Sequence, residues 1–367
     1  MTRRLSKKRL GIAVVILVVV IIGLVIGFSG DDNDVEAAPL KIGVMIPLSG
    51  QLGNYGEAAR KSILLAHEEL GANIELIIED TKCDSKEALT YISKLINING
   101  VKAIVGPFCS SETLPSAPIA NQNKIPIISP AATSPEITNA GDYVFRTAPS
   151  DLFQGKFGAE LVFDRGLKKA AMLYSNEEYG VAITRVFKEE FEKLGGQIVA
   201  DESFLPEEKD LKTQLIKIKS SDADAIYIAS AATETTAISL KQMKELGMTV
   251  ALFGTETLNG PDTLEAGDAA EGLIITSVNP GTDNFADRYR AKYNEEPGVF
   301  TPHTYDAYRA IAIAIKSGAT TGEEIKNKLY TIEFDGESGH IAFDENGEVS
   351  SDYQLLQVKN GKIVPLS

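Results

Sequence analysis

The chain has 367 residues, of which 36 are Lys or Arg and 51 are Asp or Glu, so its net charge is −15 at pH 7. This acidic balance argues against a nucleic-acid-binding protein, because such proteins need a basic surface to neutralise phosphates. The length is sufficient for two domains that each have a hydrophobic core.

The N-terminus combines a basic and an apolar segment. The first 30 residues contain five basic residues and no acid, and residues 10–28 form an apolar run of 19 residues. An uncleaved transmembrane anchor is favoured, because the apolar region of a cleaved signal peptide is usually only about 7–15 residues. The alternative is cleavage after "VEA", before Ala38. The basic flank stays in the cytoplasm, so the chain after Phe28 lies at the outer face of the membrane, or in the periplasm or extracellular medium if cleaved.

Strand and helix patterns alternate after a charged linker at 31–39. The first series predicts strands at 40–48, 74–80, 101–106 and 125–129 and helices at 55–70, 85–98 and 112–124. The second series predicts helices at 151–166, 179–196, 210–221 and 233–247 and strands at 168–175, 197–204, 223–230 and 250–254. Such alternation is typical of parallel sheets with helices on both faces. The fold class is therefore α/β, with two doubly wound lobes.

The C-terminal residues 339–364 have a different pattern. They read as strands joined by the turns "ENG" and "KNG", which predicts an antiparallel addition to the second lobe. We expect lobe 1 to comprise 40–150 and 280–335, and lobe 2 to comprise 151–279 and 336–367.

Small polar segments follow six of the predicted strands, where open parallel sheets bind ligands. Three belong to the first series, namely "LSGQLGNYG", "GPFCSSET" and "SPAATSPEIT", and three to the second, namely "SNEEYG", "SAATET" and "GTET". Their hydroxyls, amides, tyrosines and acid indicate a ligand-binding cleft between two lobes.

The segment "GPFCSSET" offers either a nucleophile or a ligand cradle. It lacks the flanking glycines of the G-x-S-x-G elbow, and a serine nucleophile needs a base. His67 lies within a helical pattern, which favours a surface or packed histidine, and His340 falls in the terminal hairpins. His303 could approach the cleft, but no orienting acid is paired with it. The histidines also lack the spacing of metal ligands. The cradle needs only Ser110 or Ser111 at a helix N-terminus, where free N–H groups attract a carboxylate. The ordinary alternative for Ser110 is a simple helix cap.

The chain has two cysteines, Cys83 and Cys109. An even pair on the oxidising side of a membrane favours a disulfide over two free thiols, and two cysteines alone make a poor metal site.

At these motifs the chain resembles the branched-chain amino-acid-binding proteins, which are type I substrate-binding proteins of ABC importers. The resemblance runs from about Leu40 to the end and is carried by "DTKCDSKEA", "GPFCSSET", "SPAATSPEIT", "EEYG", "FGTE" and "HIAFDENGEV". It implies two Rossmann-like lobes joined by crossover strands, and a disulfide between Cys83 and Cys109.

The resemblance also implies ligand-binding roles for seven residues. Ser110 would bind the carboxylate of the ligand, and Glu256 would bind its ammonium. Ala131 and Thr133 would contact both the ammonium and the carboxylate. Tyr55, Tyr179 and Phe300 would surround the side chain. The family's tyrosine at or next to Ala231 is missing here, so the pocket is expected to be larger there, or Thr233 substitutes.

The expected function is capture of a branched-chain or other apolar or small amino acid outside the cell and delivery to the membrane permease of an ABC importer. No cofactor, metal or catalysis is implied. The alternatives are a sensing ectodomain for a signalling partner and a binder of another small carboxylate. Only about nine residues precede the apolar run, too few to fold into a cytoplasmic output domain, and this favours transport.

Overall fold

The computed structural model describes residues 38–350 and 352–366. Within these ranges no helix has both the length and the apolar character needed to span a membrane. The predicted anchor at 10–28 lies outside the described residues.

The first sheet has five strands, all parallel, in the order β2-β1-β3-β4-β5. The strands are β1 (Leu40–Ile46), β2 (Ile74–Asp80), β3 (Ala103–Val105), β4 (Ile127–Ser129) and β5 (Val144–Arg146). The helices that accompany it are α2 (Gly53–Leu70), α3 (Ser85–Lys94), α4 (Ser110–Asn123), α10 (Asp283–Tyr293), α11 (Thr301–Lys316) and α12 (Gly322–Leu329). Short helical turns follow at η1 (Leu95–Asn99) and η2 (Pro135–Asn139).

The second sheet has seven strands in the order β14-β13-β10-β9-β8-β6-β7. The strands are β6 (Lys169–Ser175), β7 (Gln197–Phe204), β8 (Ala225–Ala229), β9 (Ala251–Gly254), β10 (Ile274–Val278), β13 (Tyr353–Lys359) and β14 (Lys362–Pro365). Its helices are α5 (Asp151–Asp164), α6 (Glu178–Lys193), α7 (Lys212–Ser220), α8 (Thr233–Glu245) and α9 (Pro261–Glu265), with turns η3 (Glu256–Leu258) and η4 (Gly267–Ala269). The first five strands pair in parallel, whereas β13 is antiparallel to both β10 and β14.

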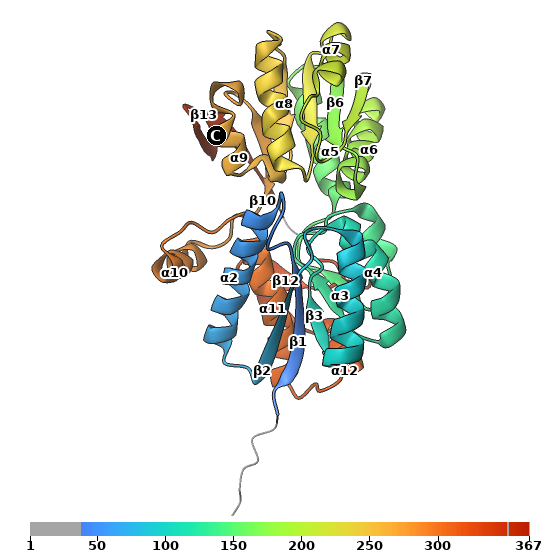
Figure 1. Ribbon diagram of the computed structural model, residues 1–367, viewed down its shortest axis with the longest axis vertical. Helices are drawn as coiled ribbons and strands as arrows, with labels where there is room; N and C mark the ends of the chain where they lie inside the picture. The colour runs from blue at the N-terminus through green and yellow to red at the C-terminus, as the bar shows by residue number, and fades with distance from the viewer. Residues whose placement is uncertain (1–37, 351, 367) are drawn as a thin grey trace, which may run out of the picture. The chain divides into compact units, whose positions relative to one another are not determined.

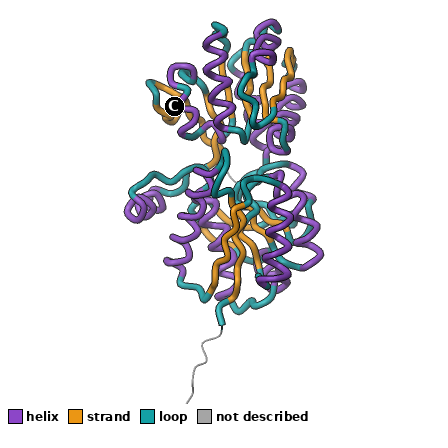
Figure 2. Tube along the Cα trace, in the orientation of Figure 1, coloured by secondary structure: helices purple, strands orange, loops and turns teal. Residues whose placement is uncertain are grey.

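This arrangement confirms the predicted α/β fold with parallel sheets. In Figure 2 the strands of each sheet run between helices, as a doubly wound sheet requires. Helix α2 ends at a stop signal of the sequence, Gly71, which adopts the left-handed conformation with φ 55°.

Segments distant in sequence complete the first sheet's core. Figure 1 shows α11, in orange, near α2, in blue. The two helices are joined by hydrogen bonds from Ser62 Oγ to Thr301 O (2.6 Å) and between His67 Nδ1 and the Tyr308 hydroxyl (2.7 Å). His67 is therefore a packed helix histidine, as its helical spacing suggested.

The C-terminal segment divides between the two sheets. We expected all of 336–367 in the second lobe, and β13 and β14 do extend the second sheet. Residues Ile341, Phe343 and Val349 instead pack in the core cluster of the first sheet, where Phe343 meets the ring of Phe145 at 5.2 Å. The predicted "ENG" hairpin is replaced by a pairing of β11 (Glu333–Asp335) with β12 (His340–Ala342). The turn at 344–348 then rests on β5, because Arg146 N donates to Gly347 O (2.9 Å).

Candidate functional site

The loops at the ends of both sheets enclose a cavity of about 420 Å³. Six of the seven predicted ligand-binding residues line it, namely Tyr55, Ser110, Ala131, Tyr179, Glu256 and Phe300. The first sheet's side contributes Ser110 and Ala131, and the second contributes Tyr179 and Glu256. The structure therefore brings together residues up to 245 positions apart in the sequence. All of them except Phe300 come from the segments that follow predicted strands, and Phe300 was expected from the resemblance alone. Their roles in ligand binding stay predictions.

The Ser110 side of the cavity is built on a tight strand-to-helix turn. Gly106 follows β3 with φ 106°, and a Cβ there would lie 2.3 Å from Met45 O, so only glycine fits. Helix α4 begins at Ser110. Glu112 N and Thr113 N already donate to Cys109 O (3.1 and 2.9 Å), so the N–H groups of Ser110 and Ser111 are the ones that lie ahead of the helix's own hydrogen bonds. Together with the helix dipole, they favour an anion in front of Ser110.

The predicted disulfide between Cys83 and Cys109 is confirmed, with the two Cα atoms 5.5 Å apart. It joins the start of α4 to the loop before α3. Glu112, in the first turn of α4, accepts through Oε2 from Cys109 N (3.2 Å), and burial raises its pKa to about 7. Cys83, Cys109 and Glu112 cluster closely enough to suggest a metal site, but the bridged sulfurs are not thiolate ligands.

The loop after β4 places Ala131 and Thr133 differently. Ala131 lines the cavity, whereas Thr133 is fully buried and donates its hydroxyl to Asp151 Oδ2 (2.9 Å). The loop is anchored by Ser129, whose Oγ accepts from Ala132 N (3.0 Å) and donates to Pro107 O (2.6 Å). Thr133 thus supports the site from behind the cavity surface.

Two acids on the other side of the cavity are buried. Glu256 follows β9, is 1% exposed, and accepts from Gln154 Nε2 (2.6 Å). Burial raises its pKa, and the hydrogen bond from Gln154 partly opposes that rise. Burial and the nearby Glu256 also raise the pKa of Asp151 well above its ordinary value. Two buried carboxyl groups of this kind favour a cationic group beside them, because a cation stabilises the ionised form that burial disfavours.

The apolar part of the cavity comes mainly from aromatic rings. Phe108 and Phe300 line it edge to face, with centroids 6.2 Å apart. Tyr55 on α2 also lines it and donates its hydroxyl to Thr257 O (2.8 Å), so one side chain joins the two sides of the cavity. His303 packs against Phe300, and its burial lowers its pKa to about 3, which leaves it neutral.

The structure adds lining residues that the sequence analysis did not name. Gln51 donates from Nε2 to Pro206 O (2.6 Å), and its backbone carbonyl accepts from the Thr233 hydroxyl (3.3 Å). Gln51 therefore also bridges the two sides of the cavity. Glu177 lines the cavity but caps α6 through Tyr179 N and Gly180 N. Gln51 lies in the quoted segment "LSGQLGNYG", so the strand-end position was its only signal. Ala231 also lines the cavity, and its short side chain leaves room there.

Comparisons with known proteins agree with this geometry. The profile of the periplasmic binding protein family matches residues 39–362. A leucine-, isoleucine-, valine-, threonine- and alanine-binding protein of Pseudomonas aeruginosa is 30% identical over 331 residues, covering 86% of this chain and 88% of that protein.

Two solved structures are similar as well. A leucine-binding protein, LivK, from Thermotoga maritima is 32% identical with a TM-score of 0.84, covering 89% of this chain and 98% of that one. The branched-chain amino acid transporter substrate-binding protein LivJ from Streptococcus pneumoniae, in complex with isoleucine, is 31% identical with a TM-score of 0.81, covering 89% and 97%. The chain described here therefore belongs to the periplasmic binding protein family.

Proposed function

We propose that this protein binds an apolar amino acid outside the cytoplasm and delivers it to the permease of an ABC importer. The observation that carries the proposal is the pairing of opposite features around one cavity: the start of α4 at Ser110 on one side and the buried Glu256 on the other. A zwitterion satisfies both, because its carboxylate suits the helix N-terminus and its ammonium suits the buried carboxylate. The relatives named for leucine, isoleucine and valine support the same ligand class.

The side chain of the ligand would occupy the apolar part of the cavity. Tyr55, Phe108 and Phe300 provide aromatic surface there, and burial of an aliphatic side chain against it is worth about 1.5–3 kcal/mol. Ala231 leaves more room than an aromatic residue would. We therefore place leucine, isoleucine, valine and somewhat larger apolar amino acids in the ligand class.

Closure of two lobes over the ligand would be the signal read by the permease. We take the lobes as 40–150 with 280–335 and 151–279 with 336–367, and we place 341–349 with the first lobe because Ile341, Phe343 and Val349 pack in its core cluster. Contacts such as Tyr55 to Thr257 join the two sides, and a ligand touching both sides would favour a closed form. The apolar run at 10–28 would tether the protein to the outer face of the cytoplasmic membrane.

A set of three matched ligands tests the proposal. L-leucine keeps both charged groups, isocaproate lacks the ammonium, and leucinamide lacks the carboxylate. At a hundredfold excess over Kd, a ligand raises the free energy of unfolding by about 2.7 kcal/mol, which corresponds to a rise of several degrees in Tm. We expect that shift with L-leucine and little or none with the other two at the same concentration.

The outcome separates the remaining alternatives. An equal shift with isocaproate would contradict amino-acid binding and indicate a receptor for another small carboxylate. Delivery is tested by adding the ligand-loaded protein to the cognate permease and ATPase in vesicles. Uptake that does not depend on this protein would contradict the transport role. The remaining function would then be that of a sensing ectodomain for a signalling partner.

A further inference from the structure

The hydroxyl of Ser110 is fixed from behind the cavity. Ser134 N donates to Ser110 Oγ (3.2 Å), and both serines are buried. A hydroxyl that accepts one N–H group keeps its own proton for donation elsewhere. Ser110 also lines the cavity, so this proton is available to an acceptor inside it, such as a carboxylate. The position of the Ser134 backbone therefore decides how Ser110 presents its hydroxyl.

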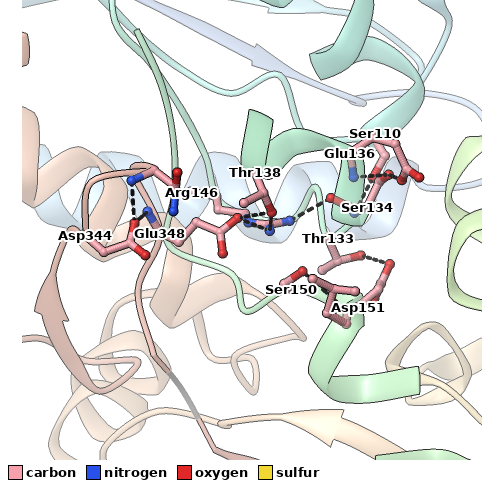
Figure 3. A network of polar contacts seen from close by, with 12 residues as sticks. Ser110, Thr133, Ser134, Glu136, Thr138, Arg146, Ser150, Asp151, Asp344 and Glu348 are labelled. Carbon is pink, nitrogen blue, oxygen red and sulfur yellow. Dashed lines mark hydrogen bonds and ion pairs between the residues drawn. The ribbon is translucent and has the colours of Figure 1, made fainter. Parts of the chain in front are cut away.

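A buried arginine holds the carbonyl of the same residue, Ser134. Arg146, the last residue of β5, is 1% exposed, and its Nη1 donates to Ser134 O (2.9 Å). Its Nη2 donates to Thr138 Oγ1 (3.2 Å) and forms an ion pair with Glu348. Figure 3 shows this line of contacts from Ser110 through Ser134 and Arg146 to Glu348.

Glu348 is itself held in a rigid turn. Its backbone N–H donates to Asp344 Oδ1 (3.0 Å), and its carboxylate also accepts from the Thr138 hydroxyl (2.6 Å). Gly347 in the same turn has φ 74°, and a Cβ there would lie 2.4 Å from Val144 O. The turn therefore fits closely against β5, and Glu348 can fix the guanidinium of Arg146 from a defined position.

We propose that Arg146, oriented by Glu348, is a positioning residue for ligand binding that sets the Ser110 hydroxyl to donate to the ligand carboxylate. Arg146 does not line the cavity, and it acts through the backbone of Ser134, whose carbonyl it binds and whose N–H reaches Ser110. This inference rests on the proposed function, since it assumes a ligand with a carboxylate at Ser110. The ion pair is thus part of the binding machinery although it lies outside the cavity lining.

A double-mutant cycle tests the proposal. The variants are Glu348→Gln, which keeps the shape and removes the charge, Ser110→Ala, and the two together, each titrated with L-leucine by calorimetry. Mutations at residues that transmit a coupling change affinity by about threefold to thirtyfold, and we expect Glu348→Gln to do so in the wild-type background. In the Ser110→Ala background the same change should cost less than about twofold, because the hydroxyl that it positions is gone.

Two further variants act as controls. Asp142→Asn breaks the ion pair with Lys326 (2.7 Å) at the opposite end of β5, and should leave leucine affinity within about twofold. Thr138→Val removes a neutral partner of both Arg146 and Glu348, and replaces Glu348→Gln in the cycle if that variant does not fold.

The results distinguish this proposal from the function on which it rests. Equal losses in both backgrounds, or no loss in either, would overturn the positioning role while leaving amino-acid binding intact. Failure of the wild-type protein to bind L-leucine would overturn both. A merely structural ion pair would lower Tm in both backgrounds without making the loss of affinity depend on Ser110.

Discussion

Replacing Glu256 by Gln isolates the charge that we assign to the ligand ammonium. Glu256 is 1% exposed and its Oε2 accepts a hydrogen bond from Gln154 Nε2 (2.6 Å). The amide oxygen of a glutamine can accept the same hydrogen bond in the same place. The substitution therefore preserves the shape and packing of the site and removes only the negative charge.

The expected loss of affinity is large. Removing one partner of a buried, hydrogen-bonded charge pair costs about 2–5 kcal/mol of binding free energy, or roughly 30-fold to 4,000-fold in Kd. The stability of the ligand-free protein, in contrast, should not fall on this substitution. Burial raises the pKa of Glu256, so its favourable contribution to stability is present below the unfolded-state pKa and is lost as the pH rises through the folded-state value. At neutral pH the variant without ligand should therefore be as stable as the wild type, or more stable.

Calorimetry with L-leucine and thermal unfolding without ligand measure the two effects. Glu207→Gln is a matched control, because Glu207 also lines the cavity but is exposed, so its charge is screened by solvent. We expect the control to bind within about threefold of wild type, a difference under 1 kcal/mol. If Glu256→Gln also stays within that limit, Glu256 is not the ammonium partner and the reasoning from its burial is refuted.

Leucine affinity should fall as the pH is lowered through the raised pKa of Glu256, because the ammonium binds its ionised form; an unchanged Kd in calorimetry across that range would contradict this. Substituting both Cys83 and Cys109 by Ser should lower the free energy of unfolding in urea by about 3.5 kcal/mol in the chain-entropy model, since the bridge joins residues 26 apart. Loss of the bridge without any change in stability would refute that estimate. Ala231→Tyr should weaken binding of phenylalanine by about 1–3 kcal/mol through overpacking while sparing alanine, and equal losses for both in calorimetry would show that Ala231 does not face the side chain. Small-angle scattering should give a smaller radius of gyration with bound L-leucine, and an identical radius at saturation would count against lobe closure.

Local sequence patterns predicted the elements of this fold well where they were strong. The run at 74–80 forms β2 and the helical spacing after it forms α3, because periodicity records which face of an element is buried. The rule that parallel strands bind ligands at their carboxyl ends also placed Ser110 and Glu256 at one cavity. That inference needed no knowledge of how the two sheets meet.

The tertiary structure alone decided which partners each residue has. From the sequence, Asp151 is an ordinary first residue of a helix. In the structure it is buried beside Glu256 and accepts a hydrogen bond from the hydroxyl of Thr133. Nothing in the sequence linked Arg146 to Glu348, which lies 202 positions later. A residue's helix or strand preference depends on its neighbours in the chain. Its burial, its pKa and its ion pairs depend on groups brought close by folding, so these could be known only once the chain was folded.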